Sequence, residues 1–181
     1  GFFLGDHGWY DKRFMYEESL RMPFIIRYPR AIQAGSVNDD IITNVDFAPT
    51  FLHYAGIEIP SKFQGRSFDP LLEGSTPEDW PQSMYYRYWM HLAHHHVYAH
   101  YGIRTRRYKL IYYYADALGQ PGAIDEKKAP EWELFDLERD PHELNNIYHH
   151  PEYADTAEQL RRELRSWQEC VRDEPYPAET P

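Results

Sequence analysis

The pattern of apolar and polar residues divides the chain into a loop-rich first part and a strand-rich second part that ends in a helix. From Tyr153 to Val171 apolar residues recur in steps of four, three, four, three and four, which predicts an amphipathic helix. Pro175 and Pro177 are expected to end it. Ahead of it, aromatic and apolar stretches separated by turn residues predict an antiparallel sheet: SMYYRYWM, HYGIRTRRYKLIYYY and EWELFDLERDP. Residues 115–130 contain two glycines and two prolines and are expected to form a loop.

The first part holds short apolar runs that are typical of buried strands. Phe24 to Ile26 is apolar without alternation and lies between Pro23 and Pro29, which predicts a strand covered on both faces. A second short strand is expected near residues 41–42. Such strands need sheet neighbours, and the chain offers few. We therefore expect the neighbours to precede Gly1 and the chain to be the C-terminal portion of a longer protein.

Three short helices are also expected in this part. One is predicted over residues 12–20 and another near 69–73. The clearest begins at Asp46, which is a good N-cap, has Pro49 in its first turn and ends before Gly56. The whole pattern predicts an α+β chain that divides into residues 1–82 and residues 83–181.

Composition limits the possible functions. The chain of 181 residues has a net charge of −10, from 29 acidic and 19 basic residues, which argues against nucleic acid as its main partner. No stretch approaches the ~18 consecutive apolar residues that a membrane span needs. The single cysteine, Cys170, excludes an internal disulfide and a cysteine-based zinc site, and it is expected to lie on a helix as a small apolar residue.

The opening stretch GFFLGDHGWYDK carries the first candidate chemistry. Asp6 and His7, flanked by glycines, can present a carboxylate and an imidazole to a metal or an anion, and Lys12 can meet the same anion as a point charge. The alternative is a loop of glycine turns in which the aspartate accepts backbone N–H groups.

A second cluster lies in HLAHHHVYAHYGIRTRR. Its five histidines leave three alternatives open, namely a histidine-only metal site, a polar aromatic loop, or substrate contact: His91, His94, His95, His96 and His100. The basic residues that follow, between Arg104 and Lys109, either attract an anionic ligand or form solvated strand edges.

The order of several motifs resembles the type I sulfatases of the alkaline-phosphatase-like superfamily, and most closely their bacterial and iduronate-sulfatase-like members. The opening stretch matches G-x-x-x-G-x-H-G-x-x-x-K, and VDFAPTFLHYAGIEIP matches V-D-x-x-P-T-x-L-x-x-A-G-I-x-x-P. GRSFDPLL, YGIRTRRYKLI and ELFDLERDPHELNN match later family motifs, so that the resemblance covers about residues 1–170. It implies an α/β fold for the whole enzyme, of which residues 1–82 end the central sheet and residues 83–181 form an antiparallel subdomain.

The resemblance also implies a partial catalytic site. The lysine at the position of Lys12 contacts the sulfate oxygens, and the histidine at the position of His7 lies nearby, in substrate contact or as loop support. The family's nucleophile is a formylglycine made within Cys-x-Pro-x-Arg, which Cys170 in CVRDE does not match. Its hydrated aldehyde attacks sulfur while a divalent cation polarises the ester. The nucleophile and the calcium ligands are expected upstream of Gly1, with no metal ligand in this chain.

The same resemblance places the C-terminal sheet beside the substrate pocket. His100 is the candidate for contact with a sugar or a sulfate, and Arg104 follows in the same segment. For Arg104 the alternative is a structural pairing with a carboxylate such as Asp136.

The expected function of the intact enzyme is hydrolysis of sulfate esters on a carbohydrate. This chain is one part of that enzyme and is expected to be inactive alone. The partners implied are a sulfated small molecule or carbohydrate and the N-terminal part of the same protein, and the location implied is periplasmic or extracellular. The alternatives are a phosphodiesterase or phosphonate monoester hydrolase of the same superfamily and a non-catalytic carbohydrate-binding module.

Overall fold

The computed structural model describes residues 1–176, and the chain forms two compact units. Residues 1–23 and the chain from residue 85 onward form the sheet unit, and residues 24–84 form the helix–loop unit. The first residues therefore pack with the antiparallel sheet. The division of the intact enzyme at residue 82 stays a prediction.

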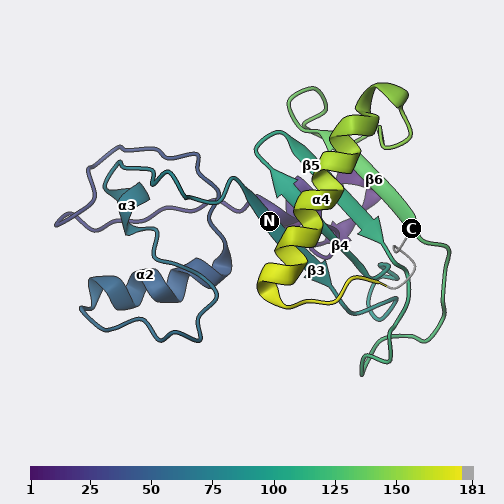
Figure 1. Ribbon diagram of the computed structural model, residues 1–181, viewed down its shortest axis with the longest axis horizontal. Coiled ribbons are helices and arrows are strands. Elements are labelled where there is room, and N and C mark those ends of the chain that lie inside the picture. The colour runs from purple at the N-terminus through teal and green to yellow at the C-terminus, as the bar shows by residue number, and fades with distance from the viewer. Residues whose placement is uncertain (177–181) are drawn as a thin grey trace. The chain divides into compact units, whose positions relative to one another are not determined.

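Four strands form the main sheet, in the order β3-β4-β5-β6 (Figure 1). They are β3 (Ser83–Tyr88), β4 (His100–Thr105), β5 (Tyr108–Tyr113) and β6 (Glu131–Asp136). Strand β5 pairs antiparallel with β4, where Gly102 faces Ile111, and with β6, where Leu110 faces Leu134. The antiparallel sheet predicted from the aromatic stretches is confirmed.

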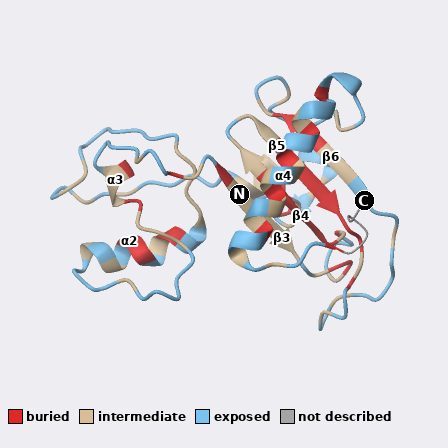
Figure 2. Cartoon of the chain, viewed as in Figure 1, coloured by how far each residue is buried: buried red, intermediate tan, exposed pale blue. Residues whose placement is uncertain are grey.

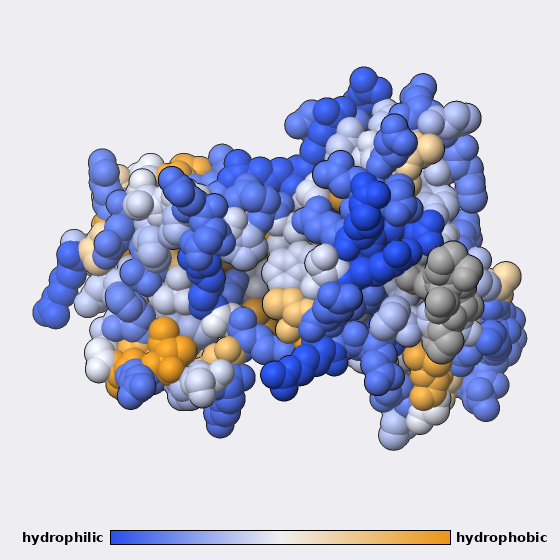
Figure 3. Space-filling view, viewed as in Figure 1, coloured by the Kyte–Doolittle hydropathy of each residue, from blue (hydrophilic) through white to orange (hydrophobic). Residues whose placement is uncertain are grey.

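Helix α4 (Ala154–Val171) lies across one face of this sheet, after a short 3-10 turn at Pro151–Tyr153 (Figure 1). Leu160 and Leu164 are 3% and 1% exposed, and they pack with sheet residues that include Tyr101, Ile103 and Leu110. The inward side of α4 is buried and its outward side is hydrophilic (Figures 2 and 3). The periodicity thus predicted this helix and its buried face correctly.

The helix ends earlier than its prolines indicated. Arg172 adopts a left-handed conformation with φ 58°, and its N–H bonds back into the last turn, so α4 ends at Val171 ahead of Pro175. Cys170 lies on the exposed side of α4. Pro177, which was also expected to end the helix, lies outside the described residues.

The other face of the sheet holds the segment that precedes it in sequence. Met15 packs with Ile111, Tyr113 and Phe135, which alternate with the residues that face α4. A Cβ at Gly102 would lie 2.7 Å from the Met15 sulfur and 2.3 Å from a strand carbonyl oxygen, so only glycine permits this approach.

Helix α1 (Glu17–Leu20) is shorter than the helix predicted over residues 12–20. Tyr16 has an extended backbone with ψ 163°. Phe14, Met15 and Tyr16 all pack in one cluster with Ile111, Tyr113 and Phe135. Three consecutive residues cannot all face one side of a helix, so packing against the sheet overrides helix formation in this segment.

The helix–loop unit contains η2 (Asn44–Asp46), α2 (Phe47–Tyr54) and α3 (Asp69–Leu72) around Phe68, Leu71 and Trp80. Both predicted helices are confirmed. The carboxylate of Asp46 accepts from the backbone N–H of Thr43 at 2.8 Å and of Arg66 at 3.0 Å. Asp46 therefore closes the turn ahead of α2 instead of capping α2 itself.

The two strands predicted in the first part are wrong for this structure. Residues 21–28 and 41–42 have no strand pairing, and Ile25 is 93% exposed. A single apolar run forms a strand only when neighbours satisfy its backbone groups, and no described residue pairs with either run. The confirmed α+β class therefore rests on the sheet unit.

Candidate functional site

A small hairpin at the start of the chain carries the first candidate residues. Strands β1 (Phe3–Leu4) and β2 (Tyr10–Asp11) pair antiparallel and enclose a 3-10 turn, η1 (Asp6–Gly8). The N–H of Gly5 donates to the Trp9 carbonyl at 2.9 Å, and Gly5 has a φ of +122° that suits glycine. Phe3 is 0% exposed and anchors the hairpin in the sheet unit.

Lys12 follows this hairpin and is exposed. No ion pair or hydrogen bond from its ammonium to another part of the described chain is present. The neighbouring Asp11 is 7% exposed and forms an ion pair with Arg13, and Nε2 of His95 lies 3.2 Å from its carboxylate. Because the guanidinium of Arg13 neutralises Asp11, the charge of Lys12 remains available to an anion.

His7 lies in the same hairpin at φ 54°. Its ring stacks on Tyr16 with centroids 4.9 Å apart, meets Phe3 edge-on at 5.8 Å, and its Nε2 is 3.9 Å from a Glu18 oxygen. No hydrogen bond or ion pair joins His7 to Lys12 within residues 1–176. The ring contacts support the loop, and its predicted role near a sulfate stays a prediction.

Arg104 belongs to a buried network of charges. Its Nη2 lies 3.0 Å from Glu17, and Lys109, which is 0% exposed, lies 2.9 Å from Glu17 and 2.7 Å from Glu143. Burial raises the pKa of the Glu17 carboxyl, but Arg104 and Lys109 more than offset this and hold the pKa below its usual value. Arg104 thus has a carboxylate partner, but that partner is Glu17 and not Asp136.

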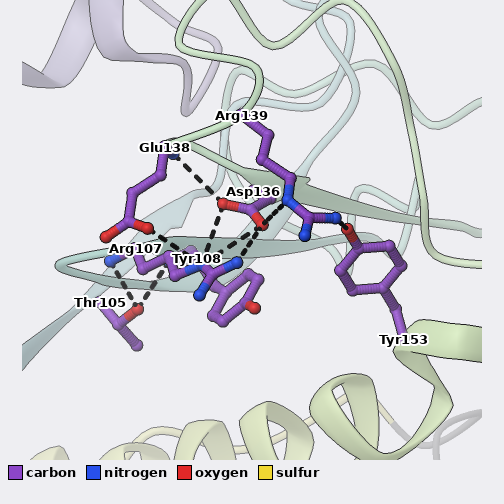
Figure 4. A network of polar contacts seen from close by, with 7 residues as sticks. All are labelled: Thr105, Arg107, Tyr108, Asp136, Glu138, Arg139 and Tyr153. Atoms are coloured by element: carbon purple, nitrogen blue, oxygen red, sulfur yellow. Dashed lines mark hydrogen bonds and ion pairs between the residues drawn. The ribbon is translucent and has the colours of Figure 1, made fainter.

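Asp136 instead pairs with Arg107 at the end of the β5–β6 pair (Figure 4). The Asp136 side chain is 2% exposed and accepts from Nε and Nη2 of Arg107 at 3.1 and 2.8 Å. The guanidinium of Arg107 lowers the pKa of this carboxyl. Arg139, which also contacts Asp136, donates to the Tyr153 hydroxyl at 2.8 Å and so links the sheet to the turn before α4.

His100 is 0% exposed and lies among aromatic rings. Its Nδ1 bonds the Tyr98 carbonyl at 2.7 Å and is therefore the protonated nitrogen, whereas Nε2 is buried with no partner within residues 1–176. Burial lowers the pKa of this imidazole to about 4, so it is neutral near pH 7. Its predicted contact with a substrate stays a prediction.

The other histidines form the polar aromatic loop that was one of three alternatives. His91 is 0% exposed, accepts from the Ala99 N–H at 3.0 Å and bonds the Glu126 carbonyl at 2.9 Å, so both its nitrogens hold the loop. His95 and His96 have φ of 56° and 55° in a turn. Within residues 1–176 no three histidine, cysteine, aspartate or glutamate side chains group as a metal site would require.

A pocket of about 440 Å³ lies in the sheet unit beside the residues that pack around Met15. Its lining combines aromatic and charged side chains, among them Phe14, Tyr16, Tyr113, Glu131 and Glu133. Sequence reasoning missed these residues. The available signal was the pair of glutamates two positions apart in EWELFD, which places both carboxylates on one face of a strand.

The chain thus has a four-stranded antiparallel sheet covered by a terminal helix, preceded by a glycine-rich loop with an exposed lysine after it. Residues 5–170 match the model of the family described as N-sulphoglucosamine sulphohydrolase, C-terminal. The chain belongs to this sulfatase family.

Curated relatives agree with this assignment. The chain is 52% identical over 175 residues to an N-acetylglucosamine-6-O-sulfatase of Bacteroides thetaiotaomicron, covering 96% of this chain and 29% of that protein. It is 30% identical over 186 residues to an ulvan-active sulfatase of Formosa agariphila, covering 94% of this chain and 37% of the relative. The chain therefore spans about a third of the length of the relatives it matches.

Solved structures share the fold. One protein in complex with its substrate D-glucosamine-2-N,6-O-disulfate matches with a TM-score of 0.87 and 50% identity, over 100% of this chain and 34% of that one. A phosphonate monoester hydrolase from Silicibacter pomeroyi matches with a TM-score of 0.75 at 24% identity, over 99% of this chain and 34% of that chain, which shows a common fold alone. In the described residues, no helix is long and apolar enough to cross a membrane.

Proposed function

We propose that this chain is the C-terminal part of an enzyme that hydrolyses sulfate esters on a carbohydrate, with a 6-O-sulfated glucosamine as substrate. The support is the 52% identity to an N-acetylglucosamine-6-O-sulfatase over 96% of the chain. A neighbour of 50% identity, solved with a disulfated glucosamine, agrees with this choice of sugar. The exposed ammonium of Lys12, beside an Asp11 that is paired with Arg13, is the observation in the structure that carries the proposal.

Lys12 is the residue proposed to contact the sulfate. Hydrolysis transfers negative charge onto the ester and sulfate oxygens, and a fixed ammonium beside them stabilises the transition state. His7, held by its stacking on Tyr16, is proposed to contact the substrate or to hold the loop that presents Lys12. For His100 and Arg104 the substrate contacts remain proposals. Their contacts in this structure support a structural alternative, in which His100 holds the aromatic side chains around it and Arg104 holds the segment around Glu17.

This chain supplies only part of the proposed catalytic site. Its described residues contain no group of side chains that fits the expected calcium, and its only cysteine lies on α4 outside a formylglycine motif. We therefore propose that nucleophile and metal ligands belong to the rest of the enzyme, and that the chain alone is inactive. One relative carries the name extracellular sulfatase, from Drosophila melanogaster, and we propose a periplasmic or extracellular location.

The test is the Lys12→Ala variant of the intact protein, assayed on glucosamine 6-sulfate and on an aryl sulfate. Loss of one charge that acts on the developing negative charge should lower kcat/KM about 10²- to 10³-fold on both substrates. Lys62→Ala, at an exposed lysine in the helix–loop unit, is the matched control and should leave turnover unchanged. Wild-type kinetics in Lys12→Ala would remove Lys12 from the site. Faster turnover of a phosphonate monoester than of either sulfate would favour the rival hydrolase.

A further inference from the structure

We propose that the pocket beside Tyr113 and Glu133 binds an unsulfated sugar unit, next to the sulfated unit that the enzyme cleaves. The choice of a sugar rests on the proposed function, whereas the preference for an uncharged unit rests on the pocket itself. Its volume of about 440 Å³ falls in the range of small-ligand sites, roughly 300–1,000 Å³.

The walls of the pocket offer aromatic surface. Phe14 and Tyr16 stack at 5.7 Å with an angle of 12° between their planes, and Tyr98 and Tyr113 also line the space. Aromatic rings give a ligand a large apolar contact area, and tyrosines add a polar tip. A sugar ring, which has apolar C–H faces and a polar rim, matches such a lining.

The polar groups are placed to bond hydroxyls. Glu133 accepts from the Tyr16 hydroxyl at 2.8 Å and has a second oxygen with further acceptor capacity. Tyr113 is 6% exposed, and its hydroxyl lies close to the Glu133 carboxylate and the Tyr16 hydroxyl, which add to the effect of burial in raising its pKa. A ligand hydroxyl can donate to Glu133 and exchange a hydrogen bond with the Tyr113 hydroxyl.

The charge of the pocket selects against sulfate. Its lining contains three carboxylates, Glu126, Glu131 and Glu133, and one ammonium, Lys128, which is already paired with Glu126. A sulfate group among these carboxylates would be repelled, whereas neutral hydroxyls or an amine would find acceptors. The pocket thus differs from the surroundings of Lys12, where the acid is neutralised.

The first experiment compares substrates with and without the second sugar, using the intact protein. Tyr113→Phe and Glu133→Gln should raise KM about tenfold for a disaccharide of glucosamine 6-sulfate and unsulfated N-acetylglucosamine, with little change in kcat. The same variants should leave the kinetics on an aryl sulfate unchanged, because it has no second sugar. Tyr112→Phe, on the same strand but facing α4, is the matched control and should leave both KM values unchanged. Equal KM values for the disaccharide in wild type and both variants would overturn the proposal.

The second experiment measures binding directly and is independent of turnover. Saturation-transfer NMR with an unsulfated N-acetylglucosamine disaccharide should give contacts in the wild type that Glu133→Gln weakens and Tyr112→Phe retains. A sulfated form of the same disaccharide should bind more weakly, and stronger binding would contradict the charge argument. If the proposed function fails, hydrolysis is absent while this binding persists; if the pocket proposal fails, hydrolysis persists and this binding is absent.

Discussion

The sheet unit and the helix–loop unit bury their apolar residues to very different degrees. In the sheet unit β5 is covered on both faces, and Leu110, Ile111 and Lys109 are all 0% exposed. In the helix–loop unit the core is Phe68, Leu71 and Trp80 with a few partly buried neighbours. The same unit leaves Ile25 and Val37 93% and 86% exposed.

The difference follows from where each apolar run finds its partners. Strands β4 and β5 are joined by a short turn and pair with each other, so their backbone bonds are formed locally. The Phe24–Ile26 run has no such neighbour in the described residues. An apolar pattern therefore predicted structure reliably only where the chain itself supplies the partner.

The largest effect is expected where the sheet unit buries charge. Lys109→Met leaves Glu143, which is 3% exposed, without its cation, and Glu17 keeps only Arg104. Breaking a buried ion pair on one side costs roughly 3–5 kcal/mol. We expect a loss of this size in the free energy of unfolding, measured by urea denaturation.

A double variant distinguishes the cost of an unpaired buried carboxylate from the cost of lost packing. In the wild type the Glu17 N–H donates to the Glu143 carboxylate at 2.6 Å. Lys109→Met/Glu143→Gln removes the buried carboxylate, and the new amide oxygen can still accept from this N–H. The double variant should therefore regain at least half of the stability that Lys109→Met loses. If the double variant is as unstable as the single one, the network does not stabilise this face through its charges.

The second effect concerns the pH dependence of the sheet unit. The pKa of His100 is lowered from 6.5 to about 4 in the folded protein, so between these values the unfolded chain binds more protons. Its contribution to stability is complete above pH 6.5 and decreases as the pH falls towards 4. The total loss is about 3 kcal/mol, at about 1.4 kcal/mol per pH unit.

The His100→Phe variant isolates this contribution, because it keeps a ring in the aromatic stack and removes the titration. Buried Glu133 and Glu143 have raised pKa values and act in the opposite direction, so the comparison must be between the variant and the wild type. The unfolding free energy of the wild type minus that of the variant, measured by urea titration at each pH, should fall by about 3 kcal/mol as the pH decreases from 7 to 4. A constant difference would show that folding does not lower the pKa of His100.

The sequence predicted the parts of the fold that depend on local patterns. The 3.6-residue period located α4, and aromatic and apolar stretches between turn residues located β3, β4, β5 and β6. The extent of α1 was not predictable, because Phe14, Met15 and Tyr16 pack against a strand almost a hundred positions later. Nor was the end of α4 at Val171, which depends on the left-handed conformation of Arg172.

For the candidate site the sequence predicted a glycine-rich loop around His7 and Lys12, and the structure has this loop. The roles of the two side chains stay predictions. The pairing of Arg104 with Glu17, and of Arg107 with Asp136, depends on register and on strand alternation across long separations, which residue types do not specify. The pocket residues Tyr113 and Glu133 lie on strands predicted correctly, but their convergence on one space is a property of the packed sheet.

The smallest effect is expected in the helix–loop unit, at Ile25. Its side chain is 93% exposed, so Ile25→Ser should change the free energy of unfolding of the 181-residue chain by less than about 0.5 kcal/mol. The relatives are about three times longer, and we predict that in a protein of that length this run, which has the sequence of a strand covered on both faces, is buried. There, burial of Ile25 would make the same substitution cost at least about 2 kcal/mol. Urea denaturation of both proteins decides the matter: equal small effects would rule out a covered strand, and a large effect in the short chain would contradict the exposure of Ile25.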